Sequence, residues 1–211
     1  MKMLELYSGT GSISKEFEKL GFKVFTIDND KRHNPSMVAD ISKLKVSDLP
    51  SEFQHPDVVW ASPDCRYFSV AALSRNWELK DGKYIPRRKE AEEALKLLER
   101  TVEIIDELNP KYWFIENPRG MMRKMAIMES LPIRSTICYC QYGDSRQKPT
   151  DIFHNCNIWT PRPMCKPKAP CHVSAPRGST TGTQGLKNAM ERSRIPSELG
   201  IELATLIKQT L

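Results

Sequence analysis

The residues best able to do chemistry lie in short polar segments that each follow an apolar run. Ser8-Gly9-Thr10-Gly11 forms a glycine turn, Ser62-Pro63-Asp64-Cys65 carries a thiol, and Glu116-Asn117-Pro118 carries a carboxylate. A glycine turn lets backbone N–H groups approach a ligand, a thiolate is a nucleophile, and a carboxylate can hydrogen-bond a reacting group. These segments suggest a nucleotide-type ligand beside a candidate nucleophile.

Two further carboxylates extend this pattern. Asp28 ends the next apolar run, 17 residues after Gly11, where a carboxylate can accept hydrogen bonds from ribose hydroxyls. Asp40-Ile41 follows a further short segment and could contact the edge of an adenine. An adenosine-containing cofactor is therefore the working hypothesis, although turn chemistry and helix capping would also explain both aspartates.

Each of these features also has a purely structural explanation. A Gly-x-Gly turn is often only a tight connection, and a cysteine near a strand is at least as often an inert buried thiol. Glu116 could simply pair with Arg119 or with a nearby lysine. The residues alone leave both interpretations open.

The elements that would position these segments alternate along the chain. Apolar periodicity predicts helices at about 13–20, at Lys89–Leu108 and from about Pro196 onward. Strands are predicted at Met3–Tyr7, Lys23–Ile27, Asp57–Ala61, Tyr112–Ile115 and Thr136–Gln141. This order predicts an α/β fold with a doubly wound, mostly parallel sheet, in which ligands bind beyond the carboxyl ends of the strands. The polar segments fall at those ends.

Composition narrows the class of protein. The chain has 211 residues, 39% hydrophobic and 27% charged, which suits one folded domain with at most a small appendage. The sequence lacks an apolar run long enough to span a bilayer and lacks the apolar core of a signal peptide. We therefore expect a soluble, intracellular protein that does not bind membranes.

The positive charge is concentrated in one late segment. The chain carries a net charge of +6, and His154–Arg194 alone accounts for all of it. This segment is also rich in proline and contains the low-complexity stretch Gly178–Thr183. Such a loop-rich insert favours a polyanionic partner, although a solvated loop with incidental lysines would have the same composition.

The six cysteines are too sparse for a disulfide scaffold in a chain of this length. The late segment contains Cys156, Cys165, Cys171 and His172. A zinc ion bound by these residues could cross-link a loop that has little apolar content. Their spacing matches no standard zinc knuckle. We therefore predict packed or free thiols there in preference to a zinc site.

The motifs resemble those of the DNA cytosine-5 methyltransferases. Residues 5–11 are similar to the first motif of that family, Asp28 to its ribose-binding acid and Asp40-Ile41 to its adenine contact. Residues 62–65, followed by Phe68-Ser69, resemble the catalytic Pro-Pro-Cys loop, and residues 114–118 resemble the Glu-Asn motif. The resemblance covers roughly residues 1–153 and is closest to small phage or prophage-encoded members.

The resemblance implies a Rossmann-like fold that uses S-adenosylmethionine to methylate C5 of a flipped-out cytosine in DNA. Cys65 would add to C6 of the cytosine, and Glu116 would hydrogen-bond N3. No metal is expected to take part. The implied cofactor contacts are Tyr7, Ser8, Gly9, Thr10, Gly11, Asp28, Asp40, Ile41, Ser62 and Pro63.

The sequence departs from the family pattern at several positions. Asp64 replaces the second proline of the catalytic loop, and Arg66 replaces the glutamine after the cysteine. The usual Gln-x-Arg-x-Arg motif is reduced to a segment in which Arg146 and Lys148 would hold the target nucleotide. Residues 192–195 read Arg-Ser-Arg-Ile in place of the neutral Gly-Asn-Ala-Val beside the cofactor.

The predicted organisation is a catalytic domain over residues 1–153, a recognition insert over 154–194 and a C-terminal helix over 195–211 that packs back on the catalytic domain. In the insert, DNA phosphates would contact Arg162, Lys166, Lys168 and Arg177. The expected partner is double-stranded DNA, bound by a monomer in the cytoplasm of a bacterium or a phage-infected host. Two alternatives stay open: an RNA cytosine-5 methyltransferase, and a catalytically silent nucleic-acid-binding homologue.

Overall fold

The computed structural model of the protein describes residues 1–174, 186 and 188–211. Its helices are α1 (Ser14–Lys19), α2 (Leu73–Asn76), α3 (Lys89–Leu108), α4 (Ala126–Glu129), α5 (Ala189–Ser193) and α6 (Ser197–Lys208). Its strands are β1 (Lys2–Leu6), β2 (Lys23–Asp28), β3 (Met37–Val38), β4 (Val58–Ala61), β5 (Trp77–Lys80), β6 (Lys83–Pro86), β7 (Tyr112–Pro118), β8 (Ile133–Cys138) and β9 (Pro149–His154).

The main sheet is mostly parallel, as the sequence predicts. Its seven strands lie in the order β3-β2-β1-β4-β7-β9-β8. The neighbouring strands β3, β2, β1, β4 and β7 are all parallel, and Leu4 of β1 pairs with Phe25 on one side and Val59 on the other. Only β9 runs antiparallel to its neighbours, β7 and β8. The α/β fold class is therefore confirmed.

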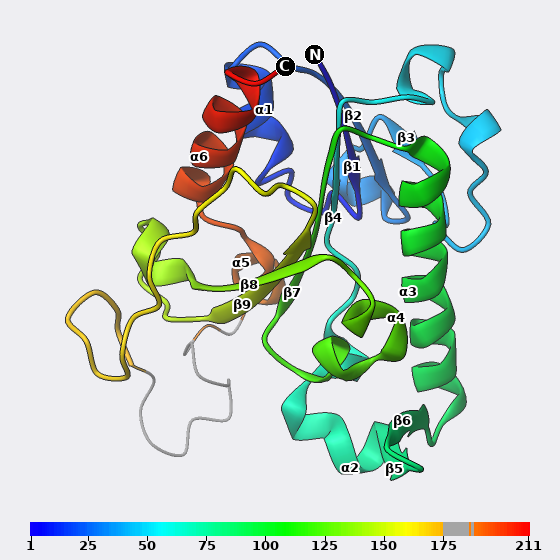
Figure 1. Ribbon diagram of the computed structural model, residues 1–211, viewed down its shortest axis with the longest axis vertical. Coiled ribbons are helices and arrows are strands. Elements are labelled where there is room, and N and C mark those ends of the chain that lie inside the picture. The colour runs from blue at the N-terminus through cyan, green and yellow to red at the C-terminus, as the bar shows by residue number, and fades with distance from the viewer. Residues whose placement is uncertain (175–185, 187) are drawn as a thin grey trace.

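Helices cover both faces of this sheet. Figure 1 shows α1 and α6 together on one face, with α3 along the other. The central strand β4 is buried at every position, so its apolar run needs cover on both sides. One core cluster joins the sheet to α3, and a second joins it to α1 and α6. Among the described residues, no helix is both long enough and apolar enough to cross a membrane.

The predicted helix Lys89–Leu108 is confirmed residue for residue, but the predicted strand Thr136–Gln141 is partly wrong. Strand β8 ends at Cys138, and Tyr139–Tyr142 form a 3₁₀ helix. Tyr139 and Tyr142 are both buried, and a spacing of three residues places them on the same side of such a helix. Gly143, at φ 83°, then ends the turn.

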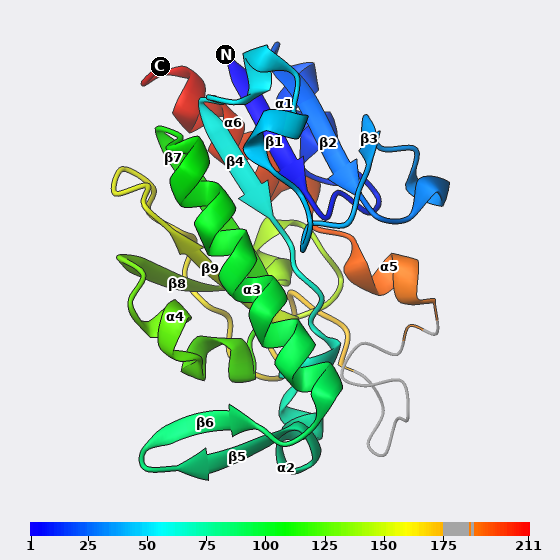
Figure 2. The same ribbon diagram turned by 90° about the vertical axis from the view of Figure 1, so that its right-hand side faces the viewer.

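Besides the two-residue strand β3, a β hairpin and strand β9 were not predicted from the sequence. Strands β5 and β6 form a separate hairpin, which Figure 2 shows below the end of α3. Strand β9 inserts between β7 and β8, so the chain returns into the sheet after its apparent last strand. His154 is the last residue of β9 and pairs with Phe114 and Ile133. The sheet therefore extends one residue into the segment predicted as the recognition insert.

Candidate functional site

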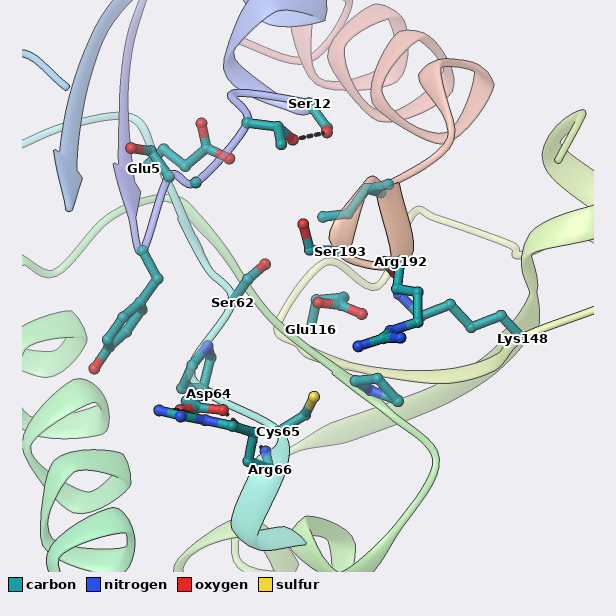
Figure 3. A pocket seen from close by; sticks show the side chains of 17 residues that line it. Glu5, Ser12, Ser62, Asp64, Cys65, Arg66, Glu116, Lys148, Arg192 and Ser193 are labelled. Carbon is teal, nitrogen blue, oxygen red and sulfur yellow. Dashed lines mark hydrogen bonds and ion pairs between the residues drawn. The ribbon is translucent and has the colours of Figure 1, made fainter. Parts of the chain in front are cut away.

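A cavity of about 580 Å³ lies at the carboxyl edge of the sheet (Figure 3). Because β1, β4 and β7 are parallel neighbours, the polar segments that follow them meet there. The cavity is lined by Glu5, Tyr7, Ser8, Gly9, Thr10, Ser12, Ser62, Pro63, Asp64, Cys65, Arg66, Glu116, Pro118, Lys148, Arg192, Ser193 and Ile195. Segments separated by more than a hundred residues in the sequence thus share one space.

The glycine turn after β1 exposes its backbone to this cavity. Gly9 and Gly11 have φ angles of 48° and 63°, in the left-handed region that favours glycine. A Cβ built on Gly9 would meet only the carbonyl oxygen of Tyr7, at 3.9 Å. Since Gly9 lines the cavity, a ligand can approach the backbone there without a side chain in the way.

The carboxylates predicted to bind adenosine lie outside the cavity lining. Asp28 is buried and accepts hydrogen bonds from the backbone N–H groups of Gly9 and Asp30, both at 2.8 Å. Its carboxylate therefore fixes the glycine turn in this structure. Asp40 is exposed and accepts from the Ser42 hydroxyl at 2.7 Å, which lowers the pKa of its carboxyl group. Ile41 packs into the core.

The cysteine loop after β4 packs directly against the end of β7. The Asn117 side-chain amide donates to the carbonyl of Pro63 at 3.0 Å. A Cβ built on Gly120 would lie 2.4 Å from the carbonyl oxygen of Phe68, so only glycine allows this close approach. These two contacts hold the loop that carries Cys65 beside the strand that carries Glu116. Figure 3 shows the Cys65 sulfur and the Glu116 carboxylate facing the same space.

The surroundings of Cys65 favour the neutral thiol. Cys65 is exposed as a residue, but its thiol lines the cavity, where desolvation raises its pKa. The carboxylates of Glu116 and Asp64 raise this pKa further, and Lys148 opposes them. Asp64 forms an ion pair with Arg66 at 2.5 Å and also accepts from the Arg66 backbone N–H. The residues that replace the proline and glutamine of the family motif therefore bind one another.

Glu116 is held in place from the antiparallel part of the sheet. It is buried, and its Oε1 accepts a hydrogen bond from the hydroxyl of Tyr139 at 2.9 Å. Tyr139 is fully buried, and burial raises the pKa of its hydroxyl well above the ordinary value. The tyrosine therefore stays a hydrogen-bond donor. Sequence analysis missed it, since only the 3₁₀ turn after β8 brings it to Glu116.

The two basic residues predicted to hold the target nucleotide have different surroundings. Lys148 lines the cavity, stacks 4.4 Å from the centre of the Tyr139 ring and donates to the carbonyl of Arg192. Burial lowers the pKa of its ammonium group. Arg146 is buried outside the lining, and its guanidinium bonds the carboxylate of Asp144 and the carbonyls of residues 191, 192 and 194.

Glu5 is a further ionisable residue of the cavity that the sequence analysis did not single out. It is only 2% exposed, and its Oε2 accepts from the Ser14 backbone N–H at 3.3 Å. Burial raises the pKa of its carboxyl group to about 7. The signal in the sequence was an acid inside the apolar strand Lys2–Leu6. Burial of a carboxyl group is unfavourable, and this side chain also lines a cavity large enough for a ligand. The two observations together suggest a cationic ligand.

The basic residues predicted to contact DNA are divided between two environments. Arg162 packs the insert on α6, through the carboxylates of Glu198 at 2.5 Å and Glu202 at 2.9 Å. Lys166 and Lys168 are exposed. Arg177 lies outside the described residues.

Comparison with known sequences gives a consistent set of relatives. Residues 1–131 match the family described as C-5 cytosine-specific DNA methylase. A probable DNA (cytosine-5)-methyltransferase of Frog virus 3 (isolate Goorha) is 32% identical, over 98% of this chain and 100% of the viral protein. The type II methyltransferase M.FnuDI of Fusobacterium nucleatum is 27% identical, over 59% of this chain and 34% of the bacterial protein.

Solved structures share the fold. A putative DNA modification methyltransferase encoded in an Escherichia coli prophage superposes with a TM-score of 0.53, at 17% identity, over 73% of this chain and 46% of that one. The Entamoeba histolytica methyltransferase EhMeth gives a TM-score of 0.54, at 12% identity, over 73% of this chain and 52% of that one. The chain thus spans about half the length of these structures and the whole length of the viral relative.

Proposed function

Because the chain belongs to the C-5 cytosine-specific DNA methylase family, we propose that its cavity methylates C5 of a cytosine in DNA through a covalent adduct with Cys65. The observation that carries the proposal is the meeting of Cys65, Glu116 and the glycine turn in one cavity at the carboxyl edge of the sheet. The enzyme class is DNA (cytosine-5)-methyltransferase, and the methyl donor of the family is S-adenosylmethionine.

The residues around the glycine turn fit this donor. Gly9 offers open backbone, and Glu5 places a buried carboxyl group on the same side of the cavity. A sulfonium cation would find a complementary charge there once Glu5 ionises. When bound, S-adenosylmethionine supplies an electrophilic methyl group. Its adenosine part would extend beyond the cavity lining toward Asp28, Asp40 and Ile41, at and beyond the end of β2.

Cys65 would supply the activation that cytosine needs. C5 of cytosine is a weak nucleophile, and attack of the Cys65 thiolate on C6 pushes an electron pair toward C5. After C5 gains the methyl group, it loses its proton, the C6–S bond breaks and Cys65 leaves as a thiolate. The raised pKa of this thiol means that the thiolate must be generated within the complex.

Glu116 and Lys148 would bind the target base. Glu116 Oε1 accepts from Tyr139, which leaves its other oxygen to hydrogen-bond the N3 edge of the cytosine. Negative charge develops in the ring as sulfur adds, and a proton shared at N3 offsets it. Lys148, which lines the same cavity as Glu116, would contact the phosphate or sugar of that nucleotide. Arg146 would act through the carbonyls of residues 191–194 as a positioning residue.

The base must leave the double helix to reach Cys65, since C6 is inaccessible inside a duplex. We assign the contacts with the strand to the recognition insert, whose exposed Lys166 and Lys168 are suited to phosphates. Arg162, which the sequence analysis assigned to DNA phosphates, would instead anchor the insert on α6 through its ion pairs with Glu198 and Glu202. Domain boundaries near 153 and 195 follow from this division.

The decisive experiment supplies the full chain with isotopically labelled S-adenosylmethionine and either unmethylated genomic DNA or RNA transcribed from it. Genomic DNA is used because it presents many sequence contexts at once. We expect labelled 5-methylcytosine in the DNA after digestion to nucleosides and mass spectrometry. Label in RNA alone would establish the RNA enzyme instead. Donor binding without transfer to either polymer would establish a silent homologue.

Donor affinity should depend on pH through Glu5. In the free protein this carboxyl group has a pKa of about 7, so at pH 6 it is mostly protonated and must lose its proton to attract a sulfonium. We expect the Kd for S-adenosylmethionine to fall by about tenfold between pH 6 and 8. Calorimetric titration measures it. In Glu5→Gln, the Kd should depend on pH only through the ionisable groups of S-adenosylmethionine itself. If the Kd of this variant depended on pH as strongly as that of the unaltered protein, Glu5 would not be the titrating group.

A further inference from the structure

Three thiols and an imidazole, none of them used by the proposed reaction, converge beside the site. We call Cys140, Cys165, Cys171 and His172 the thiol cluster; their ligand atoms all lie within 4.8 Å of one another. Cys140 Sγ is 3.2 Å from Cys165 Sγ and 3.6 Å from Cys171 Sγ. His172 Nδ1 lies 3.7 Å from Cys165 Sγ and 3.6 Å from Cys171 Sγ.

These separations match those of a tetrahedral zinc site. Zn–S bonds of about 2.3 Å and Zn–N bonds of about 2.0 Å place two sulfurs roughly 3.8 Å apart, and a sulfur and a nitrogen roughly 3.6 Å apart. The two contacts to His172 are already within about 0.1 Å of these values, and shifts of up to about 1 Å at the other pairs would let the cluster enclose an ion. Its composition, three cysteines and one histidine, is a common ligand set of structural zinc.

Amide groups around the cluster donate to the sulfurs. Gln141 Nε2 lies 3.4 Å from Cys171 Sγ, and Gln147 Nε2 lies 3.3 Å from Cys165 Sγ. Donors around metal ligands stabilise the thiolate form and orient it. Both glutamines lie within the connection between β8 and β9, so the fold itself brings them to the cluster.

The recognition insert needs such a cross-link. In the described part of the insert, Cys156 and Trp159 belong to the core, but no side chain from Thr160 to Ser174 does. Backbone contact is sparse as well, although Val173 donates to the carbonyl of Ser145 at 2.8 Å. Where apolar burial is too small to order a loop, a metal ion can supply the missing free energy.

We propose that the thiol cluster binds one structural zinc ion that fastens the recognition insert to the connection between β8 and β9. Binding releases the three thiol protons to solvent, and the four protein ligands leave no open position for substrate. From the sequence alone, packed or free thiols were preferred to a zinc site, and the zinc set weighed there included Cys156. Cys156 is buried in the core, and Cys140 lies in the cluster instead.

The position of the ion would connect the insert to the active site. Cys140 directly follows Tyr139, whose hydroxyl bonds Glu116. Gln147 likewise lies between Arg146 and Lys148. The ion would therefore hold the turn that positions the residues facing the target base, besides ordering the DNA-contacting loop.

The first test is the metal content of the intact chain. Protein purified without added chelator should contain about one zinc ion per chain by elemental mass spectrometry. Replacing zinc with Co²⁺ should produce the visible absorption of a tetrahedral thiolate site. Removing the metal with a chelator should lower Tm by at least about 5 °C, because the ion binds only the folded state. Metal-free protein with free thiols or with a Cys140–Cys165 disulfide would overturn the proposal.

Variants identify the ligands. Cys171→Ser should lose at least about nine-tenths of the bound zinc and the cobalt absorption, because three ligands hold zinc far more weakly than four. Cys156→Ala and Cys65→Ala, which change cysteines outside the cluster, should keep both. Retention of stoichiometric metal by Cys171→Ser, or its loss in Cys156→Ala, would overturn this ligand set. If Cys171→Ser does not fold, the chelator experiment on the unaltered chain decides.

Discussion

Replacing Cys65 with alanine is expected to reduce methyl transfer to DNA by about ten-thousandfold or more. Without the thiol, C5 lacks the electron pair that the addition to C6 delivers, and no other described side chain of the cavity carries a thiol. Donor binding should change by no more than about twofold, because the glycine turn and Glu5 are untouched. Rates from labelled S-adenosylmethionine and a Kd from titration separate the two effects.

The covalent step can be observed directly. Duplex DNA that carries 5-fluorocytosine should trap the unaltered protein, because fluorine at C5 cannot leave as a proton does and the C6–S bond then persists. We expect a labelled adduct that resists denaturation, and its absence in Cys65→Ala. A trapped adduct that survives in the alanine variant would exclude Cys65 as the nucleophile.

The same adduct should form faster at higher pH. The cavity raises the pKa of Cys65, so below that pKa the thiolate fraction increases about tenfold for each unit of pH. Asp64→Asn removes one of the carboxylates that disfavour the thiolate, while its amide oxygen can still accept from the Arg66 backbone N–H. The pH profile of this variant should therefore move to lower pH.

The parts of the site that follow strand ends were predictable from the sequence. Each polar segment follows an apolar run, and parallel strands deliver those segments to one edge. Cys65 and Glu116 were found in this way because their positions depend only on local strand boundaries. The bounds of α3 were also predictable from a local signal, because its apolar residues repeat with helical periodicity.

The parts that depend on long-range return of the chain were not predictable. Insertion of β9 between β7 and β8 brings Lys148 to the cavity and Tyr139 to Glu116, and no local pattern encodes that order. The same return places Cys140 among the cysteines of the insert. The Arg146 guanidinium also donates to backbone carbonyls 45 to 48 positions later in the chain, and a count of charges along the sequence cannot detect such bonds.

Glu116→Gln should produce the second largest loss, about a hundredfold to a thousandfold in the rate of methyl transfer. Glutamine can still accept from the Tyr139 hydroxyl and fill the same volume, so the fold and the position of the side chain should persist. The glutamine amide cannot share a proton with N3 of the cytosine. The negative charge that develops in the ring is therefore less well stabilised.

The affinity for DNA separates this role from a structural one. Because the defect of Glu116→Gln belongs to the transition state, its Kd for a duplex with an unpaired target cytosine should stay within about fivefold of the unaltered protein. Tyr139→Phe, which keeps the Glu116 side chain but removes its hydrogen bond to the tyrosine hydroxyl, should lose only about tenfold in rate. Equal losses of rate and DNA affinity in Glu116→Gln would show that the carboxylate merely shapes the cavity. A preserved affinity with a collapsed rate would place Glu116 at the reacting base, with Tyr139 as the residue that positions it.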